Sequence, residues 1–184
     1  MAPESRRLRQ YRVRATPVSD LTEQVPLRRA LPLVLVETAG LAVLFSVYAV
    51  LHANDSVLAP LLVPPVVSFV LVVAQPQAVG SRPGRVVGSY VIAGVVGLGF
   101  SASPGPDLLE AVAAGASTLL LMHLTGALHS PAIAVSLIAV LTDFGAAEAV
   151  AALPLLVVLS SLVVLLAWAA HRTLGDSDYP ARWW

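Results

Sequence analysis

The fold of this chain is decided by residues 119–142, which read LLLMHLTGALHSPAIAVSLIAVLT. A long apolar run ends at His129-Ser130-Pro131, and a second, shorter apolar run follows directly. Proline breaks a helix interior but suits a first helical turn, so a new helix is expected to begin at Pro131. At 1.5 Å per residue this run is shorter than the roughly 30 Å of hydrocarbon in a bilayer. Residues 131–150 therefore either cross as a short, broken helix or enter the membrane and return.

The composition of the whole chain is that of a membrane protein. Of its 184 residues 57% are hydrophobic and 12% charged, whereas soluble domains carry about 25% charged residues. The chain has no cysteine, and its four histidines match no metal-ligand spacing, so we expect no metal, cofactor or disulfide. No catalytic constellation and no nucleic-acid partner are predicted. The lipid bilayer is the first partner that this composition implies.

The apolar segments on either side of the break predict an all-α, polytopic transmembrane bundle. The segment at 57–75 contains Pro60, Pro64 and Pro65, so we expect an irregular stretch to about Val63 and a helix beginning near Pro64 or Pro65. With the short run after Pro131 there are about six membrane segments. The others are 30–52, 57–75, 86–102, 108–128 and 153–171.

Arginine distribution predicts the domains and the orientation. A polar tail (1–28), a transmembrane domain (29–174) and a polar, aromatic C-terminal tail (175–184) follow one another. Seven of the eleven arginines precede residue 30, the 76–85 loop carries Arg82 and Arg85, and the other two early loops carry none. By the positive-inside rule this predicts a multi-pass protein of the inner or plasma membrane with a cytoplasmic N-terminus. Six crossings would also place the C-terminal tail inside, and five would place it outside.

Two proline-initiated stretches resemble each other and divide the chain into halves. VPPVVSFVLVVA at 63–74 and HSPAIAVSLIAV at 129–140 each have an early proline, branched or small apolar residues and a serine. Each begins a short segment that lies between two long ones, which predicts a 3+3 inverted repeat with broken helices, as in secondary transporters. The alternative is chance likeness between apolar segments that contain proline.

The same stretches resemble the HPP family of bacterial and plastid membrane proteins, which is named for His-Pro-Pro. In LLLMHLTGALHSPAIAVSL at 119–137 the residues Thr125, His129 and Pro131 match the family pattern. Ser130 replaces the first proline, and Gly126 stands where an arginine is usual. Further matches, in the family's order, are Pro64, Ser68, Pro76, Pro83, Val86, Val87 and Gly88, and the ending HRTLGDSDYP at 171–180; Val66 and Ile133 depart from the pattern.

This resemblance covers roughly residues 30–180 and implies a helical membrane domain. Some plastid and cyanobacterial members are linked to nitrite transport, so the resemblance implies transport of a small anion. Gly126 replaces the arginine that is usual near His129, which bears on nitrite as the substrate if that arginine contacts the anion, but does not bear on the fold.

The two predicted helix starts suggest where an anion would bind. Free backbone N–H groups and the helix dipole favour negative charge at a helix start. If the starts at Pro64/Pro65 and Pro131 face each other near the midplane, the hydroxyls of Ser68 and Ser130 would join them. The alternative is structural: Ser130 caps its helix, and Ser68 bonds to the backbone.

Four titratable residues have both a functional and a structural interpretation. His129 is either a donor or proton carrier at the site or a polar residue that holds the turn. Glu37 is an intramembrane carboxylate, functional by default, unless water reaches it at the helix end. Arg82 and Arg85 either set the topology or gate an inner vestibule.

The leading functional prediction is a transporter or channel-like protein for a small solute, with a small, nitrite-like anion as the expected solute. A non-transporting scaffold subunit, rich in small residues for packing, is the alternative. A membrane enzyme would have only His129 with Ser130 or Glu37 to work with, so we predict no enzymatic activity. Gly88, Gly94, Gly97 and Gly99 would serve close packing within the chain or in a homo-oligomer.

Overall fold

All regular secondary structure of the computed structural model is helical in the residues that it describes, which are 27–54, 56–101, 108–142, 144, 146–175 and 179–184. The chain divides into two compact units, residues 1–31 and residues 32–184, and the packed helices belong to the second. Nearly all of the predicted polar tail (1–28) lies outside the described residues.

Six α-helices and three short 3₁₀ turns make up the described structure, in agreement with the predicted all-α bundle. The α-helices are α1 (Leu27–Ala53), α2 (Val63–Ala74), α3 (Pro83–Ser101), α4 (Leu108–Thr125), α5 (Ile133–Leu141) and α6 (Ala146–Thr173). The 3₁₀ turns are η3 (Ala59–Leu62), η4 (Val79–Ser81) and η5 (Ser130–Ala132).

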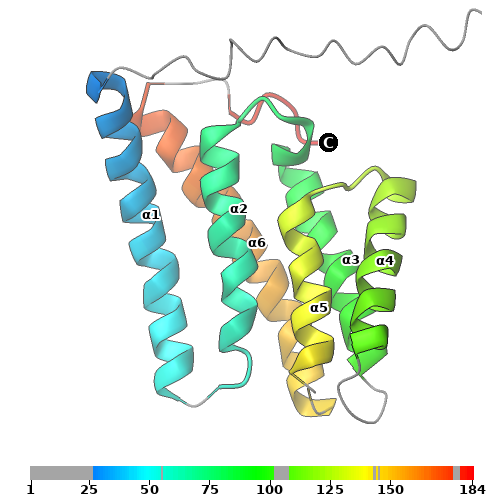
Figure 1. The fold of residues 1–184 in the computed structure, drawn as a ribbon. Helices are drawn as coiled ribbons and strands as arrows, with labels where there is room; N and C mark the ends of the chain where they lie inside the picture. Colours follow the sequence, from blue (N-terminus) through cyan, green and yellow to red (C-terminus); the bar gives the residue numbers. More distant parts are fainter. Residues whose placement is uncertain (1–26, 55, 102–107, 143, 145, 176–178) are drawn as a thin grey trace, which may run out of the picture. The chain divides into compact units, whose positions relative to one another are not determined.

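Successive helices run in opposite directions through the bundle (Figure 1). Four described helices, α1, α3, α4 and α6, are long and apolar enough to cross a membrane, and α2 and α5 with their 3₁₀ turns are shorter apolar segments. Because α5 runs opposite to α4, and α6 runs back again, residues 131–150 pass through the bundle instead of entering and returning on one side (Figure 1). The protein is therefore a multi-pass membrane protein, and its described part combines four helices of crossing length with two shorter apolar segments.

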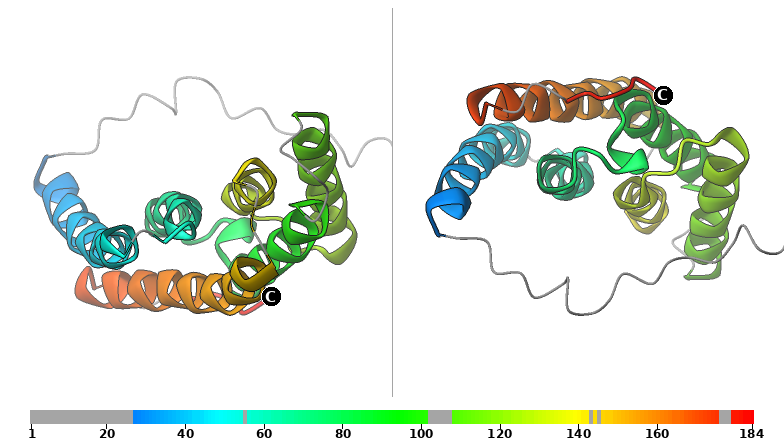
Figure 2. Two further views of the ribbon diagram at one scale, coloured as in Figure 1. Left: turned by 90° about the horizontal axis from the view of Figure 1, so that it is seen from below. Right: turned by 90° about the horizontal axis from the view of Figure 1, so that it is seen from above.

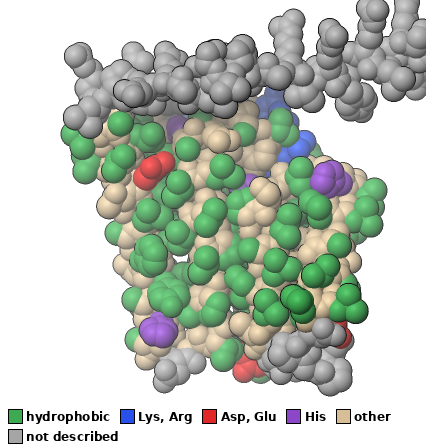
Figure 3. Space-filling model, in the orientation of Figure 1, with side chains coloured by type: hydrophobic (Ala, Val, Ile, Leu, Met, Phe, Trp, Pro, Cys, Tyr) green, Lys and Arg blue, Asp and Glu red, His purple; other side chains and the backbone are tan. Residues whose placement is uncertain are grey.

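Hydrophobic side chains cover the middle of the face shown in Figure 3, and the arginine side chains in view lie toward one end. Large apolar residues on α1 and α4 are exposed, among them Phe45, Leu120 and Leu124. In water such a surface would be unfavourable, but hydrocarbon solvates it. The end at which α3 begins and α6 ends, which carries Arg82, Arg85 and Arg172, is called the arginine end below.

Proline sets the start of the two short helices, as predicted, while the start of α6 differs from the prediction. A 3₁₀ turn with proline in its first two positions precedes each of α2 and α5. The last segment begins at Ala146, earlier than the predicted residue 153. The alanines there favour a helix, and Glu148 in the first turn complements the helix dipole.

The packing at the centre of the bundle depends on α3, which contacts α4, α5 and α6. A side chain at Gly97 would place its Cβ 2.7 Å from the Cα atom of Ser136, and one at Gly94 would meet Leu153 and Leu156. These glycines let α3 approach α5 and α6 closely. Seen along the bundle, α2 and α5 stand nearly end-on while α6 lies across them (Figure 2).

The contacts between elements follow the predicted inverted repeat. In such a repeat α2 corresponds to α5, and α3 corresponds to α6. The contact of α2 with α6 then corresponds to the contact of α5 with α3, and both are present. The contact of η5 with α2 likewise corresponds to that of η3 with α5. The correspondence is weakest at the outer helices, because α4 packs along α3 and α5 whereas α1 packs more loosely.

Candidate functional site

Three buried polar side chains meet inside the bundle, and each comes from a different element. His129 lies in the turn before η5, Ser68 in α2 and Tyr90 in α3, and their exposed fractions are 1%, 0% and 0%. Ser68 Oγ lies 2.8 Å from His129 Nε2 and 2.7 Å from Tyr90 Oη. His129 Nδ1 lies 2.9 Å from the carbonyl oxygen of Gly80. We call His129, Ser68 and Tyr90, with the Gly80 carbonyl, the polar chain.

The Gly80 carbonyl fixes the direction of every hydrogen bond in the polar chain. A carbonyl can only accept, so His129 Nδ1 carries a proton and donates it to Gly80. In the neutral imidazole Nε2 then accepts from the Ser68 hydroxyl, and Ser68 Oγ accepts from the Tyr90 hydroxyl. Every hydrogen of these three groups is used, as buried polar groups require. The polar chain is therefore complete when His129 is neutral.

Protonation of His129 would reverse the polar chain. With hydrogens on both ring nitrogens, Nε2 must donate to Ser68 Oγ, and the Ser68 hydroxyl keeps a partner for its own hydrogen by donating to Tyr90 Oη. The Tyr90 hydroxyl hydrogen is left to find a new acceptor. A proton taken up at one end of the polar chain thus frees a hydrogen-bond donor at the other end.

Local sequence explains how each group reaches the polar chain. His129 has an extended backbone at the start of η5 and makes no capping hydrogen bond there, so its side chain is available to the core. The turn before it is made by Gly126, whose φ of 70° lies in the region that side chains disfavour. Pro64 and Pro65 are buried in the first turn of α2 and place Ser68 in its second turn.

The two helix starts do not face each other, which corrects the predicted arrangement. α2 and α5 run in opposite directions, so their proline-containing starts point to opposite ends of the bundle (Figure 1). An inverted repeat requires the two helices to run in opposite directions, because the second half is turned over. Backbone N–H groups of α2 and α5 therefore do not converge on one anion, and side chains of the polar chain occupy the interior instead.

The remaining candidate residues near the break lie outside the polar chain. Ser130 is exposed and half-buried Pro131 follows it in η5. Thr125 donates to the carbonyl oxygen of Leu121 in its own helix, at 2.8 Å. Ser68 does not make the backbone hydrogen bond that was its structural alternative; its partners are the side chains of His129 and Tyr90.

The three charged candidates lie apart from the polar chain as well. Glu37 is half-buried in α1 and lines none of the described cavities. Arg85 has a buried Nε atom without a hydrogen-bond partner in the described structure. Arg82 lines a polar cavity at the arginine end and donates to the main-chain oxygen of Trp184 at 2.9 Å.

That cavity, called the vestibule below, has a volume of about 320 Å³ and is largely polar. Arg82 and Arg182 supply two positive charges, and none of the residues described around it is acidic. Its walls come from the α2–α3 loop and the C-terminal tail, namely Pro76, Gln77, Ala78, Arg82, Tyr179, Ala181 and Arg182. Gly80, which accepts from His129, belongs to the same loop. The loop therefore connects a basic entrance with the buried polar chain.

The C-terminal tail holds this loop in place, a contact that the sequence did not predict. The Tyr179 hydroxyl donates to the carbonyl oxygen of Ser81 at 3.1 Å, and Gly84 N–H donates to Trp183 at 2.8 Å. The Trp184 ring lies directly on Gly84, where a side chain would not fit. Burial raises the pKa of the Tyr179 phenol, which keeps the hydroxyl protonated and able to donate.

Sequence reasoning missed Tyr90 and Arg182, and singled out His129 and Ser68 without pairing them. One signal for Tyr90 was available: it is the only tyrosine in a helix of glycine, valine and other small residues. The distance of 2.8 Å between Ser68 Oγ and His129 Nε2 is also one that a nucleophile and its general base would have. Ser68 is fully buried and shares its oxygen with Tyr90, however, so the described structure gives a substrate no approach to it.

Comparison with known proteins gave one match. The sequence profile described as "HPP, transmembrane region" matches residues 22–180, which is most of the chain and includes every member of the polar chain. Neither the comparison with curated proteins nor that with solved structures returned a match.

Proposed function

Because this chain belongs to the HPP transmembrane family, we propose that it is a transporter for a small polar solute, and that the solute is a small anion. The observation that carries this proposal is the polar chain itself. Polar side chains inside a membrane bundle are costly, and those that persist there commonly mark a solute or proton pathway.

The vestibule supports an anion as the solute. Arg82 and Arg182 raise the local concentration of anions at the arginine end, which we place in the cytoplasm by the positive-inside rule. From there the Gly80 carbonyl leads to His129, Ser68 and Tyr90. In the described conformation these side chains are closed off from solvent, as expected of an occluded state in an alternating carrier.

Reversal of the polar chain suggests how an anion and a proton would be carried together. A proton on His129 frees the Tyr90 hydroxyl as a donor, and an anion that accepts this hydrogen bond also neutralises the imidazolium. Bound alone, either charge would be costly in the low-dielectric interior. We therefore propose proton-coupled transport of a monovalent anion.

The test is uptake into proteoliposomes that contain the purified protein, with nitrite, nitrate, formate and chloride as separate substrates. We expect uptake of at least one anion, with a loss of tenfold or more in Tyr90→Phe and Ser68→Ala. Ser160→Ala is the matched control, because Ser160 is also fully buried but bonds only within α6, to Val157. If folded protein took up none of these anions, the small-anion proposal would be wrong, and a scaffold role would become the leading one.

A further inference from the structure

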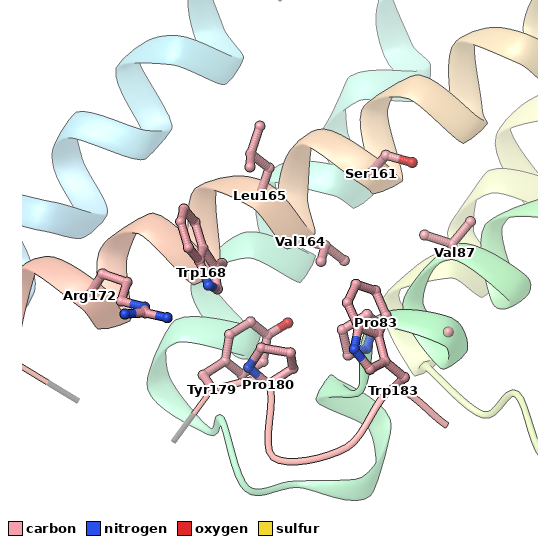
Figure 4. A pocket seen from close by; sticks show the side chains of 11 residues that line it. Pro83, Val87, Ser161, Val164, Leu165, Trp168, Arg172, Tyr179, Pro180 and Trp183 are labelled. Carbon is pink, nitrogen blue, oxygen red and sulfur yellow. The ribbon is translucent and has the colours of Figure 1, made fainter. Parts of the chain in front are cut away.

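A second cavity at the arginine end is larger than the vestibule and of a different character. It has a volume of about 860 Å³ and lies between α6, the start of α3 and the C-terminal tail. Figure 4 shows one face of α6 opposite Tyr179, Pro180 and Trp183, with Pro83 and Val87 of α3 at the side. Its volume is in the range of sites that hold organic ligands.

The cavity is graded from apolar to charged along α6. Val164 and Leu165 form most of its inner part with Val87, Ser161 adds one hydroxyl there, and Trp168 and Arg172 lie nearer the helix end. Arg172 and Val164 are separated by about 12 Å along the helix axis at 1.5 Å per residue. A ligand that fills the cavity therefore meets a positive charge at the end of the bundle and hydrocarbon further in.

The charged end has the composition of a membrane interface. The Arg172 guanidinium lies 5.3 Å from the centre of the Trp168 ring, which holds it beside the cavity. Trp168 is partly exposed, and Trp183 lines the tail side of the same opening. Tryptophan and arginine at this depth are the side chains that contact lipid headgroups.

We propose that this cavity binds one anionic glycerophospholipid, with its phosphate at Arg172 and an acyl chain along Val87, Val164 and Leu165. Charge complementarity selects the headgroup, since Arg172 is the only charged residue among those that line the described cavity. The exposed side chain of Leu165 shows that the inner part opens toward the surface that lipid covers. This site does not depend on the proposed transport.

The test is lipid retention, measured by native mass spectrometry on protein purified in a nonionic detergent with added phosphatidylglycerol or phosphatidylcholine. We expect one retained phosphatidylglycerol per chain and at least fivefold less phosphatidylcholine. Arg172→Gln should lower phosphatidylglycerol retention at least fivefold. Arg182→Gln is the charge-matched control, because it removes the same charge from the vestibule, and it should leave retention unchanged.

A second variant tests the apolar half without altering charge. Leu165→Trp should fill the inner part and lower retention of both lipids, while an excess of inorganic phosphate should displace neither. The melting temperature of each variant in the same detergent shows whether it is folded. Equal retention in the Arg172 and Arg182 variants, displacement by phosphate, or a dimer in place of bound lipid would each overturn the proposal.

Discussion

At the scale of single residues, Ser68 has the central position because its one hydroxyl both donates and accepts. It donates to His129 and accepts from Tyr90, so its removal would leave two buried polar groups without partners. Each such group costs about 1–3 kcal/mol. We expect Ser68→Ala to lower the free energy of unfolding by more than Ser160→Ala, whose hydroxyl bonds only within its own helix.

Thermal unfolding of both variants in the same detergent would measure this difference. A melting temperature for Ser68→Ala equal to that of Ser160→Ala would mean that the hydrogen bonds of the polar chain contribute nothing to folding. Tyr90→Phe should fall between the two, since it removes a donor but leaves the Ser68–His129 bond in place.

The polar chain also predicts a direction for the pH dependence of transport. The hydrogen bonds of the polar chain are complete when His129 is neutral, and their direction reverses only when His129 takes up a proton. Anion uptake should therefore rise as the pH on the entry side falls, and it should lose this dependence in His129→Gln. Uptake rates measured at fixed anion concentration from pH 8 down to pH 4 would decide this, because a buried imidazole takes up a proton less readily than one in water. A rate that rises with pH would contradict the proposed coupling.

The sequence predicted the parts of the site that depend on local features of the chain, and it missed the parts that depend on packing between helices. Ser68 and His129 were predicted because each lies beside a proline break, which is a local feature. Tyr90 was not, because its place beside Ser68 is set by the packing of α3 across the bundle. Gly80 contributes only a backbone carbonyl, for which residue type gives no signal.

At the scale of the elements, the close crossing of α3 and α5 depends on Gly97. A valine there would push against the backbone of Ser136 and force the two helices apart. Overpacking of this kind typically costs about 1–3 kcal/mol. We expect Gly97→Val to lower the melting temperature and the yield of folded protein.

The control for this prediction is Gly99→Val in the same helix, because a side chain at Gly99 would meet no atom within 4 Å. Comparable stability of the two variants would show that α3 and α5 need not approach so closely. The sequence predicted the glycine-rich character of α3, but it did not distinguish Gly97 from Gly99, since only the position of α5 does so.

At the scale of the whole transmembrane unit, alternating helices place loops at two ends, and this can be tested chemically. The chain has no cysteine, so single cysteines can be introduced without interference. Cysteines at Asn54 and Thr142 should react from one side of the membrane, and cysteines at Gln75 and Thr173 from the other. Labelling of intact cells with a membrane-impermeant maleimide would measure this, and labelling of Thr142 and Thr173 from the same side would contradict six crossings.

The number of segments and the placement of their breaks were predictable, whereas the relation between the two halves was only partly so. Hydrophobic length and proline define segments locally, and the inverted repeat followed from their order. The prediction that the two proline-containing helix starts face each other near the midplane was wrong. α2 and α5 run side by side in opposite directions, so they begin at opposite ends of the bundle (Figure 1).

The polar chain has a consequence for the energetics of the living membrane. Its only basic side chain is the His129 imidazole, so it can take up one proton per cycle. One proton carried with one monovalent anion moves no net charge. A membrane potential, which is worth about 2.3 kcal/mol per elementary charge at 100 mV, would then neither drive nor oppose the movement. Accumulation should follow the pH difference alone and should be unchanged when valinomycin and potassium set the voltage to zero.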